Sequence, residues 1–379
     1  MRQDGAVIAF GPMSITLLIC TLQGLVLAVL LLRAAANRAA NINLALLILG
    51  VALLITPYTI GYAGFYDRYP WLSFAPFSYT LAFGPLIYRY TCSLTGAART
   101  AGWPHFVPVI AQFLADALVF PFPLPMKNAW NSAVNAPILS PLFETTALVS
   151  IAVYGIAAWR RYRAYRVWLA ETRSDGVDFD PGWIRNFLIA LALTAVIWTG
   201  FELANVINPA RNYFDQFGLY VWFSALVLYL GIEGWRHAGT PFPRPEPATA
   251  PQPDEAPAPQ RDWSMIGAQW LAQIDAELLW QDPDITLTSL ARHLGTNTAY
   301  LSRALNAAAQ ENFNAIINRR RVRAVQARLE SGDCPRDMMT LAFDAGFRSK
   351  ASFNRAFADF AGMSPSAWRL KSQKTLPAA

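Results

Sequence analysis

Seven long apolar segments constrain the fold of this chain more than any other feature. Hydrophobic residues fill 54% of its 379 positions, and they concentrate before about Trp235. Each segment is close to the ~20 residues that a helix needs to cross the hydrocarbon of a bilayer. The composition is typical of a membrane protein rather than of a soluble enzyme. The predicted spanning helices are Ile8–Leu32, Ile42–Ala63, Leu72–Cys92, Phe106–Phe122, Ile138–Trp159, Ile184–Val206 and Phe214–Trp235.

The arginines between these segments predict an orientation. One set of loops is rich in arginine, whereas the alternate set carries only four basic residues. Because basic residues favour cytoplasmic loops, we expect the N-terminus outside and everything after Trp235 in the cytoplasm. The basic run Arg160–Arg166 could bind nucleic acid, but such a run beside a span more commonly binds anionic lipid, which we favour. The first segment lacks the basic start of a signal peptide, so we expect a retained helix.

Carboxylates in or at the ends of four apolar segments suggest a polar site near the outer side of the membrane. Ionisable groups at such depth usually face a bundle interior or a wet cavity. One hypothesis is a pocket that binds a cationic or polar small molecule. The alternative is that the carboxylates pair with Arg211 or Lys127, or lie among lipid headgroups and bind nothing. The pocket hypothesis rests on Asp116, Glu144, Glu202 and Asp215, with Tyr58, Trp71 and Trp198.

A proline-rich segment separates the membrane part from the rest. Thr240–Gln260 contains eight prolines, so it is expected to be extended, semi-rigid and accessible to proteases. We therefore predict an all-α chain with a seven-helix transmembrane domain at residues 1–237, a linker at 238–260 and a soluble domain at 261–379. The three cysteines are far apart and the three histidines are scattered, so the sequence predicts no metal site, cofactor or catalytic motif.

The stretch Met338–Arg369 has the pattern of a helix, a tight turn at Gly346 and a second helix capped by Ser349. In the second helix, Phe353, Phe357 and Phe360 form one apolar stripe. Its opposite face is basic and polar, which suits the DNA major groove, although an ordinary amphipathic helix with a solvated face has the same pattern. The predicted reading residues here are Lys350, Ala351, Asn354 and Arg355.

An earlier stretch repeats this organisation. Thr286 can cap a helix at Leu287–Leu294, Gly295 makes the turn, and Asn297 can cap a helix from Thr298 to about Ala308. Two such units on one rigid helix would meet successive major grooves on one face of DNA. The predicted base contacts in the first unit are Thr298, Ala299, Ser302, Arg303 and Asn306. In the connecting helix, Phe313–Leu329, the arginines can contact phosphate or pair with acidic side chains; the predicted phosphate contacts are Arg319, Arg320 and Arg323.

Leu287–Arg369 resembles the DNA-binding domain of the AraC/XylS family of bacterial transcription regulators. The likeness is carried by LTSLARHLG with AYLSRALN, by FNAIINRRRV, and by LAFDAGFRSKASFNRAFADFAGMSPSAWR. It implies base contacts from the two recognition helices. The chain departs from the family at Gln310, where Gly is usual, and at Val325, where Ala is usual. With its apolar first part, it is similar to the less common membrane-bound regulators of this family, which implies the bacterial inner membrane.

We therefore expect a membrane-anchored transcription regulator rather than an enzyme. Its expected partners are double-stranded DNA and the lipid bilayer, with a small-molecule ligand in the pocket hypothesis and a homodimer to double the DNA footprint. Two other interpretations stay open at this point. The first part could be a transporter or membrane enzyme fused to a regulator, or a passive anchor from which proteolysis releases the DNA-binding domain.

Overall fold

A computed structural model describes residues 7–97, 100–175, 179, 182–208, 210–211, 213–240, 242–245, 262–331 and 337–375. The chain divides into two compact units. The first contains the described residues up to Arg163 and those from 182 to 245. The second contains residues 164–175 together with the described residues from 262 onward. The second unit therefore includes a segment that the predicted domain boundaries placed in the transmembrane domain.

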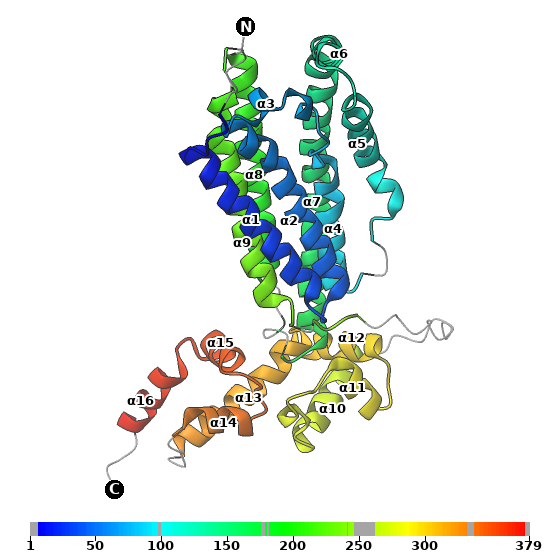
Figure 1. Cartoon of the computed structure of the whole chain (residues 1–379). Coiled ribbons are helices and arrows are strands. Elements are labelled where there is room, and N and C mark those ends of the chain that lie inside the picture. Colours follow the sequence, from blue (N-terminus) through cyan, green and yellow to red (C-terminus); the bar gives the residue numbers. More distant parts are fainter. Residues whose placement is uncertain are drawn as a thin grey trace, which may run out of the picture. The chain divides into compact units, whose positions relative to one another are not determined.

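The described residues form helices and no named β-strand, as the all-α prediction requires. Among the described residues, five helices are long and apolar enough to cross a membrane: Pro12–Arg33, Arg38–Tyr62, Leu124–Thr172, Gly182–Ile207 and Phe214–His237. Figure 1 shows α1, α2, α8 and α9 as long helices of the first unit. The elements of the first unit are α1 Pro12–Arg33, α2 Arg38–Tyr62, α3 Phe65–Arg68, η1 Pro70–Leu72, η2 Thr80–Ala82, α4 Phe83–Leu94, η3 Trp103–Phe106, α5 Val107–Val119, α6 Leu124–Trp130, η4 Asn131–Leu139, α7 Ser140–Thr172, α8 Gly182–Ile207, η5 Tyr213–Gln216 and α9 Phe217–His237.

Five of the seven predicted spans correspond to these long helices, and the other two predicted segments form shorter helices among the described residues. Within Leu72–Cys92, Pro76 lacks an amide hydrogen and disfavours helix at the residue before it. A regular helix is therefore delayed until the 12-residue α4. The next segment yields the 13-residue α5, which spans about 20 Å and is shorter than the ~30 Å hydrocarbon core. It is followed by Pro121 and Pro123, so the helix ends at Val119.

The fifth predicted span is longer than expected. Helix α7 runs for 33 residues, from Ser140 to Thr172, and so continues for 13 residues beyond the predicted end at Trp159. Those last residues include the basic run Arg160–Arg166. The residues of α7 from 164 onward belong to the second compact unit.

Glycines allow the helices of the first unit to approach closely. A Cβ atom placed on Gly231 of α9 would lie 2.4 Å from a methyl carbon of Leu27, and one on Gly234 would lie 2.3 Å from a methyl carbon of Leu44. Both separations are shorter than any real carbon–carbon contact. Small residues commonly permit such close crossings between apolar helices.

The second unit is built from short helices with side-chain caps. Thr286 and Ser289 form a reciprocal capping box at the start of α11, and the side chains of Asn297 and Ser349 cap α12 and α15. These three predicted caps are confirmed. The elements are α10 Trp263–Ala276, η6 Leu279–Gln281, α11 Leu287–His293, α12 Thr298–Ala309, α13 Phe313–Glu330, α14 Met338–Asp344, α15 Lys350–Ala361 and α16 Pro365–Thr375.

Two separate apolar cores hold the second unit together, and α13 contributes to both. Leu301 and Leu305 of α12 pack with Phe313 and Ile317 of α13 in the first core. The second core consists of the buried residues Val322, Val325, Leu329, Leu341, Ala342, Ala345, Phe347, Phe353, Ala356 and Phe357. The connecting helix therefore joins two helix-turn-helix units, each with its own core.

Gln310 is expected to be mildly unfavourable where it stands. It ends α12 with a φ of 56°, in the left-handed region that costs a residue with a Cβ about 1–2 kcal/mol. Gln310→Gly should therefore raise the free energy of unfolding by about 0.5–1 kcal/mol, after the added flexibility of the unfolded chain is subtracted. Amide hydrogen exchange of α12 and α13, followed by mass spectrometry on the full chain, measures this change. The matched control is Gln269→Gly in the interior of α10, which should accelerate exchange instead.

Candidate nucleic-acid interface

Helix α12 presents its predicted reading residues to solvent. Thr298, Ala299, Arg303 and Asn306 are exposed, and Ser302 is half-buried. Leu301 and Leu305, on the other side of the helix, have at most 1% of their surface exposed. The amphipathic pattern thus leaves an arginine, an asparagine and two hydroxyl side chains on one accessible face.

Arg303 is oriented by an aromatic side chain. Its guanidinium carbon lies 4.6 Å from the ring centroid of Trp263 on α10, in the range of a cation–π interaction. Trp263 in turn packs edge-to-face with Tyr300, at 5.3 Å between ring centroids. This stacking limits the rotamers of a long side chain, so Arg303 needs less ordering when it binds a ligand.

Helix α15 has the same arrangement in the second helix-turn-helix unit. Lys350, Ala351, Asn354 and Arg355 are all exposed. The predicted apolar stripe lies opposite, with Phe353 and Phe357 fully buried and Phe360 half-buried. Arg and Lys can donate to guanine and Asn can pair with adenine, so both helices carry groups that recognise base edges.

The three arginines predicted to contact phosphate differ in their surroundings. Arg319 forms an ion pair with Glu311 and lies over the ring of Phe360. Arg320 donates to both carboxylate oxygens of Asp275, at 2.5 and 3.1 Å. Arg323 is exposed and has no ion pair with any residue that the structure describes. Of these three arginines, only Arg323 could therefore contact a DNA phosphate without first breaking an ion pair. Arg319 and Arg320 would have to exchange a carboxylate for a phosphate.

Arg321 has a structural role that the sequence pattern did not reveal. Its side chain is 1% exposed, and it donates to the carbonyl oxygens of Trp280 at 2.7 Å and Asp282 at 2.8 Å. Its guanidinium also lies 5.7 Å from the ring centroid of Phe347. Burial lowers the pKa of Arg321 to about 10, an effect that the nearby Asp175 and Asp282 oppose, so the side chain remains charged at neutral pH.

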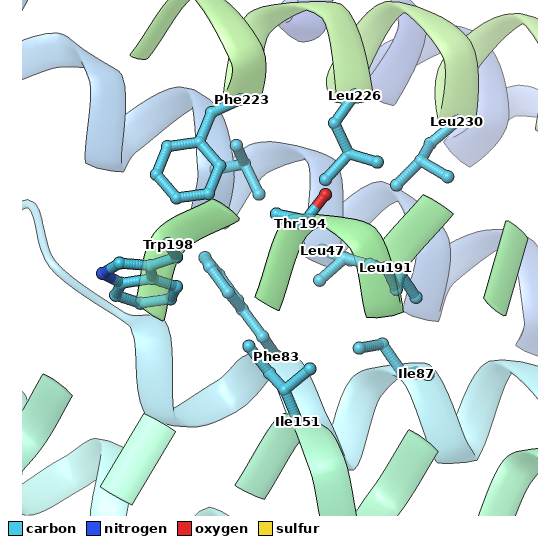
Figure 2. A pocket seen from close by; sticks show the side chains of 11 residues that line it. Leu47, Phe83, Ile87, Ile151, Leu191, Thr194, Trp198, Phe223, Leu226 and Leu230 are labelled. Carbon is cyan, nitrogen blue, oxygen red and sulfur yellow. The ribbon is translucent and has the colours of Figure 1, made fainter. Parts of the chain in front are cut away.

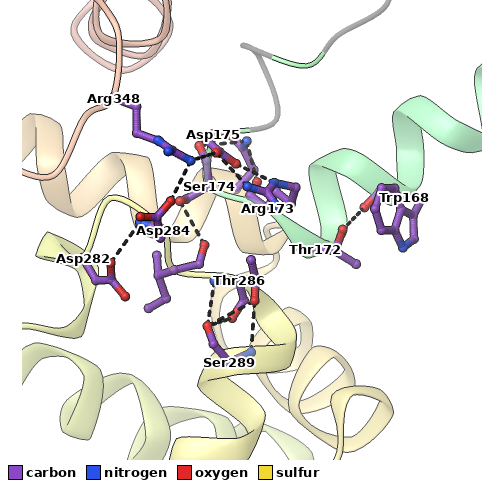
Figure 3. Close-up of polar contacts among 12 residues, drawn as sticks. Trp168, Thr172, Arg173, Ser174, Asp175, Asp282, Asp284, Thr286, Ser289 and Arg348 are labelled. Atoms are coloured by element: carbon purple, nitrogen blue, oxygen red, sulfur yellow. Dashed lines mark hydrogen bonds and ion pairs between the residues drawn. The ribbon is translucent and has the colours of Figure 1, made fainter. Parts of the chain in front are cut away.

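A short segment that directly follows α7 is bound to both helix-turn-helix units (Figure 3). Arg173 pairs with Thr286 in an isolated antiparallel bridge, and the hydroxyl of Ser174 donates to the carbonyl of Ile285 at 3.2 Å. Asp175 accepts hydrogen bonds from Arg173 at 2.7 and 2.9 Å and from Arg348 at 3.2 Å. The hydrogen bond to Asp175 raises the pKa of Arg173. No local pattern in the sequence predicts this contact, because its partners are more than 100 residues apart.

The first unit brings together four of the seven residues of the predicted membrane pocket. Trp198 donates to Glu202 at 3.0 Å, and Glu144 interacts electrostatically with Glu202. Tyr58 interacts electrostatically with both carboxylates and donates to Gln216 at 2.8 Å. Of the other three residues, Asp116 lies on α5, Asp215 lies in η5 and Trp71 lies in η1. Lys127 does not pair with the carboxylates of this cluster, because its ammonium group donates to the carbonyls of Trp71 and Ser73.

A cavity nearby in the same unit is apolar rather than polar (Figure 2). It is lined by Phe83, Leu191, Trp198 and Phe223, among others, and its volume is about 20 Å³, which suits a water-sized molecule rather than a drug-sized one. The hydroxyl of Thr194 in its wall is already bonded to Ala190 and Trp222. Among the residues that the structure describes, no group of three His, Cys, Asp or Glu side chains could hold a metal ion.

Comparison with known proteins gave one result. Residues 290–371 match the family model of a helix-turn-helix domain. The match begins within α11 and ends within α16, so it includes both recognition helices and the helix that connects them. Searches of curated proteins and of solved structures found no match.

Proposed function

We propose that this chain, whose residues 290–371 form an AraC-type helix-turn-helix domain, is a membrane-anchored transcription regulator that couples a signal at the membrane or its outer face to gene expression. The observation that supports this most is the pair of exposed recognition faces on α12 and α15, joined by one continuous helix. Two units so connected can read successive major grooves. The five long apolar helices supply the anchor.

The topology and the signal are part of the same proposal. The proposed orientation has the N-terminus outside and the DNA-binding domain in the cytoplasm of a bacterium; the arginine-rich loops of the sequence support it. The cluster of Tyr58, Glu144, Trp198 and Glu202 is the candidate site for a cationic or polar ligand. Its test is the response of a reporter gene to Glu144→Gln and Glu202→Gln, with protein levels in the membrane as the control. An unchanged response in both variants would remove the pocket from the proposal.

Loss of either recognition arginine is expected to weaken specific DNA binding. Arg303→Ala and Arg355→Ala should each cost about 1–3 kcal/mol if the arginine makes a bidentate contact to guanine. The duplex is first selected from genomic fragments with the full chain in nanodiscs, and its affinity is then measured by fluorescence anisotropy. Arg328→Ala, in the last turn of α13, is the control with the same loss of charge. Unchanged specific binding in both recognition variants would contradict the assigned reading faces.

A further inference from the structure

We call the segment Arg173–Asp175 the plug. It is a polar segment buried against the part of the chain that contains the helix-turn-helix units. Ser174 is 1% exposed and Asp175 is 2% exposed, although both are polar and follow directly on a helix end. The plug and its partners all belong to the second compact unit. A buried carboxylate is costly unless it is paired and hydrogen-bonded, so this seat has to be specific.

The groups that hold the plug are those that proteins use to hold phosphate. Asn314 of α13 donates to the carbonyls of Arg173 and Ser174, at 2.9 and 3.2 Å, and Asn318 donates to the carbonyl of Ser174 at 2.9 Å. Arg348 donates to Asp175, and its guanidinium also lies 2.6 Å from the exposed carboxylate of Asp284. Arginine and asparagine side chains of this kind commonly contact phosphate oxygens in protein–DNA complexes.

These donors adjoin the elements that carry the predicted reading faces. A recognition helix enters the major groove with its N-terminal residues. Arg348 stands directly before Ser349, the N-cap of α15, so it is at the end of that helix that meets DNA. Asn314 and Asn318 are on the helix that joins the two units, and the strand between two successive grooves has to run past that join.

We propose that Arg348, Asn314 and Asn318 form a phosphate-binding site for DNA, and that the plug occupies this site in the present structure and inhibits DNA binding. Asp175 takes the place of a phosphate on Arg348, and the carbonyls of Arg173 and Ser174 take the place of phosphate oxygens on the two asparagines. This inference rests on the proposed DNA-binding function. It adds a means of control, because Arg173 follows the last residue of α7 without a linker, so a shift or rotation of α7 is carried directly to the plug.

The test uses the full chain in nanodiscs of zwitterionic lipid and a short fluorescent duplex of random sequence, because phosphate contacts do not depend on sequence. Asp175→Asn should raise the affinity about threefold or more and steepen the dependence of log K on log salt by about one. In that background, Arg348→Ala should abolish the gain. Arg348→Ala alone should change the affinity less than about twofold, because the plug already masks the arginine.

Two further variants separate release of the plug from other effects. Asp344→Asn is the matched control, because it also removes a carboxylate that accepts a hydrogen bond from an arginine, Arg328, at 3.1 Å. It should leave the affinity within about twofold of the original chain. The double change Arg173→Gly with Asp175→Gly releases the plug without altering net charge, and it should raise the affinity as Asp175→Asn does. If hydrogen exchange shows that Asp175→Asn unfolds α13, this double variant decides the question.

The outcomes distinguish the plug from the proposed function. The plug proposal is overturned if Asp175→Asn binds DNA no more tightly than Asp344→Asn does, or more weakly than the original chain does. In that case the specific binding tested with the Arg303 and Arg355 variants is unaffected, and the proposed function still stands. A chain that binds only after the plug is released supports it. If neither the original nor the released chain binds any duplex, both the plug and the proposed function fail.

Discussion

Phe353→Ala is expected to unfold the second helix-turn-helix unit while the first remains folded. Phe353 is fully buried, and its ring packs edge-to-face with Phe347 at 5.3 Å and with Phe357 at 5.7 Å between centroids. Truncating a buried phenylalanine leaves a cavity and costs about 3–5 kcal/mol. Because the two units have separate apolar cores, the loss should stay local to α14, α15 and the second half of α13.

Hydrogen exchange on the full chain tests this prediction. Amides of α15 should lose most of their protection, and those of α12 should keep theirs. Phe343→Ala is the matched control, because Phe343 lies in the same unit with 54% of its side chain exposed. It should change stability by no more than about 0.5 kcal/mol. Equal loss of protection in α12 and α15 would show that the two units unfold together, contrary to the prediction.

Arg321→Ala is expected to lower the free energy of unfolding about as much as Phe353→Ala does, but for an electrostatic reason. The change removes two charge-assisted hydrogen bonds, to the carbonyls of Trp280 and Asp282, and leaves both acceptors without this donor. Such bonds are worth about 1.5–3 kcal/mol each, so a loss of about 3–5 kcal/mol is expected. The effect should reach both helix-turn-helix units, because Arg321 also packs over Phe347 of the second helix-turn-helix unit.

The controls lie on the same helix and in the same charge class. Arg323→Ala removes an exposed arginine two residues away and should leave stability within about 0.5 kcal/mol. Arg321→Lys keeps the charge but lacks the rigid fork that reaches two carbonyls, so it should rescue only part of the loss. The measurement is the free energy of local opening of η6, α13 and α14 from hydrogen exchange. A loss in Arg321→Ala no larger than in Arg323→Ala would contradict the bridging role.

Control through α7 would give the DNA-binding unit a direct connection to the apolar part of the chain. A proline-rich segment by itself would act as a semi-rigid tether. A plug that competes with phosphate instead converts a small movement of one helix into a change of DNA affinity. The size of that change is limited by the number of phosphate contacts that the plug masks.

The sequence alone determined those features that depend on near neighbours in the chain. The caps at Thr286, Asn297 and Ser349, the turns at Gly295 and Gly346 and the buried faces of α12 and α15 are local, since a cap or an apolar stripe is defined within one or two helical turns. The same reasoning found the five long apolar helices. It did not reveal that two further predicted segments form shorter helices, because hydropathy averages over prolines that interrupt a helix.

Only the tertiary structure decided what depends on residues far apart in the sequence. Arg319, Arg320 and Arg321 are consecutive and chemically identical, but each helical step of 100° turns the side chain toward a different environment. One therefore pairs with Glu311, the next with Asp275, and the third is buried on backbone carbonyls. The plug is the clearest case. Its binding site is assembled from three separate parts of the chain, at Ile285–Thr286, at Asn314 and Asn318, and at Arg348, and no local pattern records which of them will meet.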